Sequence, residues 1–372
     1  MRIISRPLTQ VPDEASLALI GPASDLLFID IETTGLSREK NHVYLIGCAY
    51  YQPEGWHMIQ WFDNTGIDEK QILSSFRIFA SEYRCLVHYN GSRFDIPFLQ
   101  KRLILNGLEP LPDQMRSMDL YGVVRPYKRL LGLPDYRQQT LEAYLKTGRT
   151  EEQSGKDLIR TYKQYIANPC QELLEPVLQH NQADLEGLAG ILPVMSYQYL
   201  SRSTVRVRKA QANYYRDPAG KQAEELLLHF SLDIHVPVPL YSSLDGCHIK
   251  IEGDRGLLKV PLYNEVMKYF YANYKDYYYL PEEDMAIHKY IAGYVDREHR
   301  VQARAETCYT RKPGVFLPQW QDGEGRLFVT PFFRRGYREP DYFFEFTEEH
   351  KKDRQFLSEY AAYVFGHILE AG

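Results

Sequence analysis

The amino-acid sequence predicts an α/β fold in residues 1–200, with a mixed sheet flanked by helices, followed by a separate α+β domain in residues 201–372. The first observation is length: the chain has 372 residues, whereas a single hydrophobic core stops growing at ~250 to 300. The second is that apolar runs of strand length come first and then alternate with helical patterns, as in parallel crossovers. The third is the basic run RSTVRVRK at residues 202–209, which interrupts the apolar periodicity between the two parts.

Three strands are predicted near the start of the first domain, at residues 26–30, 43–51 and 56–62. The last two are separated by Gln-Pro-Glu-Gly at residues 52–55, which is a turn signal. We therefore expect these two strands to pair antiparallel.

A helix is predicted next, from an N-cap at Asp68 to about residue 83, with apolar side chains along one face. Residues 85–89 then form an apolar strand-like run and residues 96–105 a helical one, which is typical of a parallel crossover. The sheet is therefore predicted to contain antiparallel and parallel pairs. Further helices are predicted at residues 140–146, 156–167 and 175–193, with Pro176 in the first turn of the last one.

The C-terminal part contains strand-like segments at residues 226–236 and 248–262, and it ends in a predicted helix with a broad apolar stripe. Its arginine-rich segments at residues 202–209 and 334–338 accompany several tyrosine clusters. These features have two interpretations. They are either solvated charges and packed strand tyrosines, or a patch that follows phosphates and stacks on bases.

Composition excludes several classes of protein. Hydrophobic residues make up 44% of the chain and charged residues 25%, which is typical of folded soluble domains. The net charge of -5 gives no overall basic field of the kind that attracts nucleic acid. The five cysteines include no CxxC pair, so we expect neither a structural zinc site nor a disulfide framework. No apolar stretch approaches ~18 residues and the N-terminus lacks a signal pattern, so we expect a cytoplasmic protein with no membrane segment.

The sharpest local motif is LLFIDIETTG, which places Asp30 and Glu32 two residues apart at the end of an apolar strand. Side chains two apart on a strand point to the same face, so the two carboxylates repel each other. Hard divalent cations such as Mg²⁺ or Mn²⁺ would relieve that repulsion. The alternative is an exposed strand end beside a turn.

Two further motifs carry acids. In HYNGSRFDIPFL, Asp95 follows a strand and opens a helix, where it is either a functional acid or an N-cap. In LQHNQADLEG, His180 and Asp184 stand four residues apart and share a helical face. The alternative for this pair is a surface hydrogen bond.

Taken in chain order, these elements resemble the DEDD superfamily of 3'-5' exonucleases, whose four carboxylates hold two metal ions in a ribonuclease H-like fold. Within it, the sequence is similar to the bacterial YprB-like predicted exonucleases. The similarity covers about residues 20–200 and implies a ribonuclease H-like mixed five-stranded sheet. The motifs that carry it are IDIETTGL, HYNGSRFDIPFL, MDLY at 118–121, QTLEAYL at 139–145 and HNQAD at 180–184.

The resemblance implies that Asp30, Glu32, Asp95 and Asp184 are metal ligands for two Mg²⁺ or Mn²⁺ ions. It implies hydrolysis of nucleic-acid phosphodiester bonds from the 3' end, with release of nucleoside 5'-monophosphates. A single-stranded 3' end is the expected substrate, and nothing distinguishes DNA from RNA. Cations are needed because the negative phosphodiester oxygens repel an attacking hydroxide.

The resemblance also implies a residue that orients the attacking water, and here the sequence departs from the family. The family places a Tyr four positions before the last Asp or a His five positions before it. This chain has His180 at the first spacing and Gln179 at the second. We expect His180 to be the base, because an imidazole accepts a proton near neutral pH and an amide does not.

Five residues are predicted to contact the substrate. Thr33, Thr34 and Gly35 follow the DxE strand, where small groups and backbone amides let a terminal nucleotide approach. Asn90 lies in the turn before Asp95, and Phe94 either wedges against the terminal base or is buried in that turn.

Two other functions stay open. A ribonuclease H-like acidic cluster also suits an endonuclease or resolvase. A non-catalytic module that binds nucleic acid or protein is the second alternative, although uncompensated acids would repel phosphates. Protein partners are unknown at this point.

Overall fold

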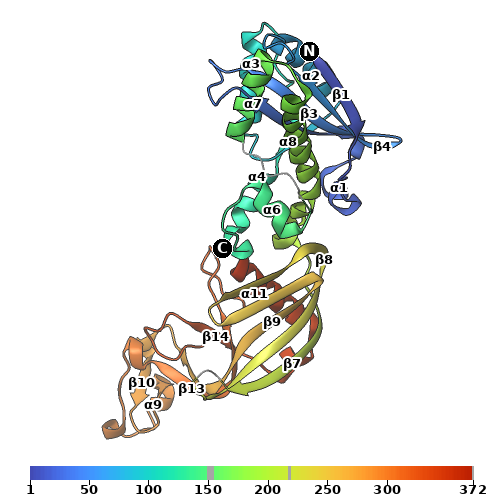
Figure 1. The fold of residues 1–372 in the computed structure, drawn as a ribbon. Coiled ribbons are helices and arrows are strands. Elements are labelled where there is room, and N and C mark those ends of the chain that lie inside the picture. The colour runs from blue at the N-terminus through green and yellow to red at the C-terminus, as the bar shows by residue number, and fades with distance from the viewer. Residues whose placement is uncertain (149–154, 217–218, 371–372) are drawn as a thin grey trace. The chain divides into compact units, whose positions relative to one another are not determined.

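The computed structural model describes residues 1–148, 155–216 and 219–370 (Figure 1). The chain divides into two compact units, Met1–Leu200 with Val236–Val238 and Ser201–His235 with Pro239–Gly372. That these units are independent domains stays a prediction. Within the described residues, no helix combines the length and the apolar character needed to cross a membrane.

The first unit contains a six-stranded mixed sheet in the order β1-β4-β3-β2-β5-β6. The pairs β1–β4, β4–β3 and β3–β2 are antiparallel, whereas β2–β5 and β5–β6 are parallel. The predicted mixed sheet is thereby confirmed. The strands are β1 (Arg2–Pro7), β2 (Leu26–Thr33), β3 (Val43–Gln52), β4 (Gly55–Phe62), β5 (Cys85–His88) and β6 (Arg116–Asp119).

The number of strands corrects the expected count of five. The strands that no predicted range covers are β6, at one edge of the sheet, and β1, which pairs with β4 and forms the other edge. All six of its residues are exposed or partly exposed, and they include Arg2, Arg6 and Pro7. An edge strand of this kind lacks the continuous apolar run by which the central strands were predicted.

Helices cover both faces of this sheet. On one face, α2 and α3 contribute Phe76 and Phe98 to a core cluster with the strands. On the other, α7 and α8 pack Tyr162 and Leu178 against Phe62 of β4. The helices are α1 (Glu14–Ile20), α2 (Glu69–Ala80), α3 (Asp95–Leu105), α4 (Leu120–Val124), α5 (Lys128–Leu131), α6 (Gln138–Leu145), α7 (Gly155–Ala167) and α8 (Gln171–Gly190).

The longest helix of the unit, α8, begins earlier than its proline suggested. It starts at Gln171, so Pro176 lies inside the helix rather than in its first turn. Leu174 is buried in the core cluster with Tyr162, and this packing favours an extension of the helix upstream of the proline. After Gly190 the chain continues as a 3₁₀ helix, Leu192–Arg202.

The second unit is built on a five-stranded sheet in the order β14-β13-β9-β8-β7. Helix α11 (Arg354–Glu370) contacts β7 and β9, and Phe365 of the helix packs against Phe230 of β8. A three-stranded sheet in the order β11-β10-β12, with β11 at Met285–His288 and β12 at Val301–Gln302, adds to the unit, so the predicted α+β class is confirmed. The five main strands are β7 (Arg206–Arg216), β8 (Gln222–Leu244), β9 (Cys247–Phe270), β13 (Tyr309–Gln319) and β14 (Tyr342–Glu345).

Most of the clustered tyrosines and two of the arginines are engaged inside this unit. Tyr271 stacks on Tyr277 of β10 (Tyr277–Leu280) with ring centroids 4.3 Å apart. Arg334 donates to the Tyr342 hydroxyl, and Arg335 forms an ion pair with Glu265 at 2.8 Å. Packing and pairing therefore account for these side chains.

Candidate functional site

Strand β2 carries the first two acids of the site. The side chains of Ile29 and Ile31 enter the core, so Asp30 and Glu32 emerge together on the opposite face of the sheet. Burial raises the pKa of Asp30 well above its ordinary value, and the neighbouring carboxylates of Asp184, Glu32 and Asp95 add to the rise. The two acids therefore share the face and the repulsion that the motif predicted.

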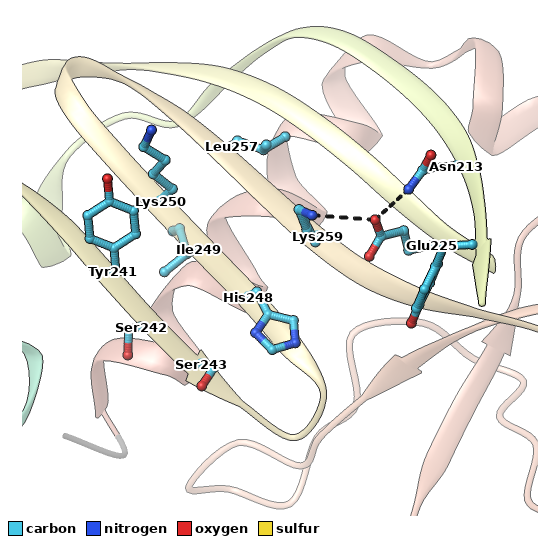
Figure 2. A pocket seen from close by; sticks show the side chains of 11 residues that line it. Asn213, Glu225, Tyr241, Ser242, Ser243, His248, Ile249, Lys250, Leu257 and Lys259 are labelled. Atoms are coloured by element: carbon cyan, nitrogen blue, oxygen red, sulfur yellow. Dashed lines mark hydrogen bonds and ion pairs between the residues drawn. The ribbon is translucent and has the colours of Figure 1, made fainter. Parts of the chain in front are cut away.

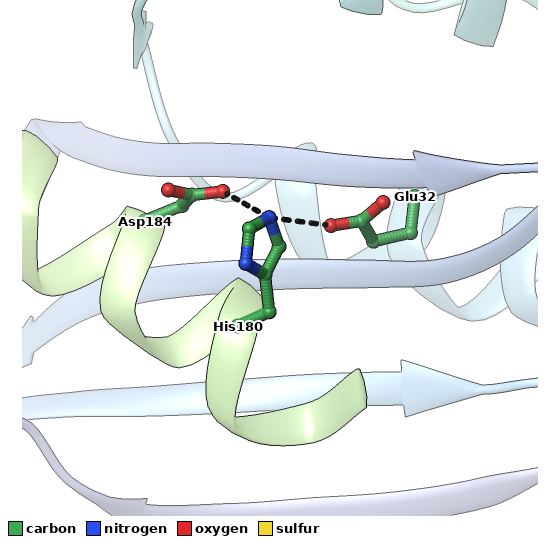
Figure 3. A group of neighbouring side chains, drawn as sticks. All are labelled: Glu32, His180 and Asp184. Carbon is green, nitrogen blue, oxygen red and sulfur yellow. Dashed lines mark ion pairs between the residues drawn. The ribbon is translucent and has the colours of Figure 1, made fainter. Parts of the chain in front are cut away.

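Helix α8 crosses this face and supplies a histidine and a third acid (Figure 3). Nε2 of His180 lies 3.2 Å from Oδ2 of Asp184, one turn further along the helix, and 3.7 Å from Oε1 of Glu32. One ligand atom from each of these three residues lies within 4.8 Å of the others, a spacing that suits a metal ion. The alternative interpretation, a surface hydrogen bond, is wrong, because His180 is buried and lies beside Glu32 of β2.

Asn181, next to His180, ties α8 to Asp30. Its Nδ2 donates to Oδ2 of Asp30 at 2.8 Å, and its Oδ1 accepts from Nε2 of Gln60 at 2.9 Å. Gln60 and Asn181 are completely buried. Gly47 of β3 makes room for the amide, since a Cβ at this position would lie 1.9 Å from Oδ1 of Asn181. The three strand residues lie side by side, because Gly47 pairs with Asp30 on one side and with Gln60 on the other.

Helix α3 supplies the fourth acid, Asp95, which is its first residue. The N-cap position belongs to Phe94, so the interpretation of Asp95 as the N-cap is wrong. Burial raises the pKa of Asp95 to about 7, against hydrogen bonds from the backbone amides of Asp95 and Ile31, and the Asp119 and Asp184 carboxylates contribute to the rise. Asp30 and Asp95 thus interact electrostatically with Asp184, whereas among the described residues only Glu32, His180 and Asp184 bring their ligand atoms within 4.8 Å of one another.

The turn before α3 is held by Asp119 at the end of β6. The Asp119 carboxylate accepts from the backbone amides of Asn90 at 2.7 Å and Ser92 at 3.3 Å. Asn90 has a left-handed backbone, with φ 56°. Gly91 fits against the buried His88, since a Cβ would lie 2.7 Å from the imidazole ring. Asp119 belongs to the MDLY motif, but its role depends on a neighbouring strand and no local pattern revealed it.

The predicted substrate-contacting residues lie at two edges of the acidic cluster. Thr33 Oγ1 donates to the Gly35 carbonyl, and Thr34 Oγ1 accepts from the His42 amide, so both hydroxyls stabilise the turn after β2. Phe94 is partly buried and contacts Phe98, with ring centroids 5.4 Å apart. Asn90 is exposed. Their contacts with a nucleotide stay a prediction.

Sequence reasoning missed Gln60, Asn181 and Asp119 as parts of the site. Asn181 lies inside the HNQAD motif, and Gly47 interrupts the apolar run of β3. Neither feature identifies the contact from the sequence alone, because Gln60 and Asn181 are 121 residues apart in the chain.

Comparisons with known proteins agree with this architecture. A family model described as the RNase_H superfamily matches residues 27–195. The uncharacterized protein YprB of Bacillus subtilis (strain 168) is 28% identical over 216 residues, which cover 55% of this chain and 52% of YprB. The resemblance to ribonuclease H-like, YprB-like proteins is therefore confirmed. The chain spans about half the length of this relative.

Solved structures with a partial likeness include E. coli exonuclease I in complex with a 5cy-dA13 oligonucleotide. That structure has a TM-score of 0.31 and 13% identity, over 56% of this chain and 54% of that chain. The family B DNA polymerase of Pyrobaculum calidifontis has a TM-score of 0.36 and 14% identity, over 94% of this chain and 46% of that chain.

Proposed function

Taking the ribonuclease H superfamily match over residues 27–195 as the premise, we propose that this protein is a metal-dependent 3'-5' exonuclease. Its substrate is a nucleic acid with a single-stranded 3' end, and its products are nucleoside 5'-monophosphates. The observation that supports the proposal is the group of Glu32, His180 and Asp184, whose ligand atoms lie within 4.8 Å of one another, with Asp30 and Asp95 in electrostatic contact with Asp184.

The chemistry of the donors fits two divalent ions, Mg²⁺ or Mn²⁺. Asp30, Glu32, Asp95 and Asp184 offer the carboxylate oxygens that hard cations prefer. Burial, with repulsion by the neighbouring carboxylates, raises the pKa values of Asp30 and Asp95, and a bound cation would favour their charged forms. When bound, the ions supply positive charge that neutralises the phosphodiester.

The side chains around the acids have separate tasks. Asn181, itself oriented by Gln60, fixes the rotation of the Asp30 carboxylate. Nε2 of His180 lies between Glu32 and Asp184, where it accepts the proton of the attacking water. The oxygen of that water bonds to phosphorus, the bond from phosphorus to the 3' oxygen breaks, and the departing 3' oxygen takes a proton from solvent.

The test uses single-stranded DNA and RNA oligonucleotides that carry a 5' fluorophore and either a free or a blocked 3' end. With Mg²⁺ or Mn²⁺, wild type should shorten the free strands stepwise from the 3' end and leave the blocked strands intact. Asp30→Asn serves as the inactive control. Internal cuts in the blocked strands would identify an endonuclease, and no cleavage of any strand by the metal-loaded protein would overturn the proposal.

A further inference from the structure

A groove lies on the face of the second unit's main sheet that α11 leaves open (Figure 2). Phe230 of β8 points to α11, so Glu225, an odd number of positions away, points to the opposite face. The groove on that face has a volume of about 740 Å³. A second groove of about 620 Å³ shares Tyr215 and His248 with the first, so the two adjoin at these residues.

Two tyrosines present their rings to solvent in this groove. Tyr241 is 61% exposed and Tyr215 is 41% exposed. Nζ of Lys250 lies 5.5 Å from the centre of the Tyr241 ring. An exposed aromatic ring in a concave site offers a flat surface on which another planar group stacks.

The floor of the groove is polar, and its charges are already paired. Glu225 accepts from Nδ2 of Asn213 at 2.7 Å and lies 3.6 Å from Nζ of Lys259. Nζ of Lys250 lies 2.6 Å from Glu252. The groove therefore has little net charge. A ligand that depended on many phosphate contacts, such as a duplex, would gain little here.

We propose that this groove binds single-stranded nucleic acid, with bases stacked on Tyr241 and Tyr215. Stacking on aromatic rings tolerates any base, because every base has a π face. Lys250 lies near the Tyr241 ring and Lys259 lines the same groove, so each is in a position to contact a phosphate. The proposal concerns binding, goes beyond the exonuclease proposal and requires no hydrolysis.

The experiment measures the anisotropy of fluorescein-labelled dT and U oligonucleotides titrated with the full-length protein. EDTA is present throughout, so binding is measured without metal-dependent cleavage. Tyr241→Ala and Tyr215→Ala should each weaken binding about 5- to 100-fold, which is the loss expected for one base stack. Tyr241→Phe should bind like wild type, because it keeps the ring.

The chain offers a matched control at Tyr290. This residue is 77% exposed, and Nζ of Lys289 lies 6.0 Å from its ring centre. Lys289 is paired with Asp276, as Lys250 is with Glu252, but neither Tyr290 nor Lys289 lines the groove. Tyr290→Ala should therefore leave the dissociation constant unchanged.

Salt provides an independent measurement on the same samples. Each phosphate contact with a single strand changes the slope of log K against log salt by about 0.7, so two lysines predict a slope no steeper than about -1.5. The proposal for the groove would be overturned by a salt slope much steeper than about -1.5, by equal losses of affinity in Tyr241→Ala and Tyr290→Ala, or by no binding of wild type. Intact binding by a wild-type protein that cleaves no strand when loaded with metal would refute the exonuclease proposal alone.

Discussion

The acidic cluster and the groove of the second unit differ in how their charges are arranged. In the cluster, Asp30 and Asp95 lie among other carboxylates, and their raised pKa values show that the charged forms are disfavoured. In the groove, Glu225 and Lys250 each lie beside a partner of opposite charge. Buried carboxylates beside one another are typical of a site that takes a cation, whereas paired charges beside open aromatic rings suit a ligand held by stacking.

Removal of one acid should give the largest effect and separate the two regions. We expect Asp30→Asn to lower kcat by about 10³-fold or more, because a bound cation contributes several kcal/mol of transition-state stabilisation. The substrate affinity of the groove, measured in EDTA, should stay the same. Single-turnover rates on a 3' end-labelled strand provide the measurement. Wild-type rates in the variant would remove the acidic cluster from the proposed chemistry.

Loss of the imidazole should have the next largest effect. We expect His180→Ala to lower kcat by about 10²- to 10⁴-fold and to keep metal affinity, as for the loss of a general base. Calorimetric titration with Mn²⁺ measures the affinity, and Gln179→Ala is the control at the neighbouring position. If His180→Ala loses the metal as well, His180 is a ligand, in line with its place beside Glu32 and Asp184.

The burial of Asp95 near other carboxylates should also affect the stability of the metal-free protein. Because the pKa of Asp95 is about 7 in the folded state and near 4 when unfolded, folding favours the protonated form. The stability that protonated Asp95 contributes is complete below pH ~4 and is lost as pH rises through ~7. The free energy of unfolding of Asp95→Asn should therefore exceed that of wild type by on the order of 2–4 kcal/mol at pH 8. The two values should match at about pH 4.

Urea denaturation in EDTA at several pH values measures this difference. Asp135→Asn is the control with the opposite sign, because a hydrogen bond from Thr140 lowers the pKa of Asp135. A difference in the free energy of unfolding between Asp95→Asn and wild type that does not change with pH would contradict the raised pKa of Asp95.

The smallest expected effect tests how Asp30 is oriented. Asn181→Ala should lower activity or metal affinity about 10- to 100-fold, as changes beside a metal site commonly do. Gly47→Ala should act similarly, because its Cβ would displace the Asn181 amide. Gly366→Ala, where a Cβ meets no atom within 4 Å, is the control. Unchanged Mn²⁺ affinity and kcat in both test variants would make Asn181 a purely structural residue.

The sequence by itself determined the features that depend on residues a few positions apart. A strand repeats every two residues, so Asp30 and Glu32 had to share a face, and a helical turn brings His180 next to Asp184. The same local periodicity predicted the central strands and the covering helices. It was weakest at β1, where an edge strand buries little apolar surface.

Only the tertiary structure decided which distant elements meet. Gln60, Asn181 and Gly47 act together because β2, β3 and β4 pair in one register and α8 packs across them. Asp119 holds the turn before α3 because β6 lies beside β5. The groove likewise joins β7, β8 and β9. These contacts depend on strand register and helix docking, which arise from the packing of the whole unit and which no local pattern encodes.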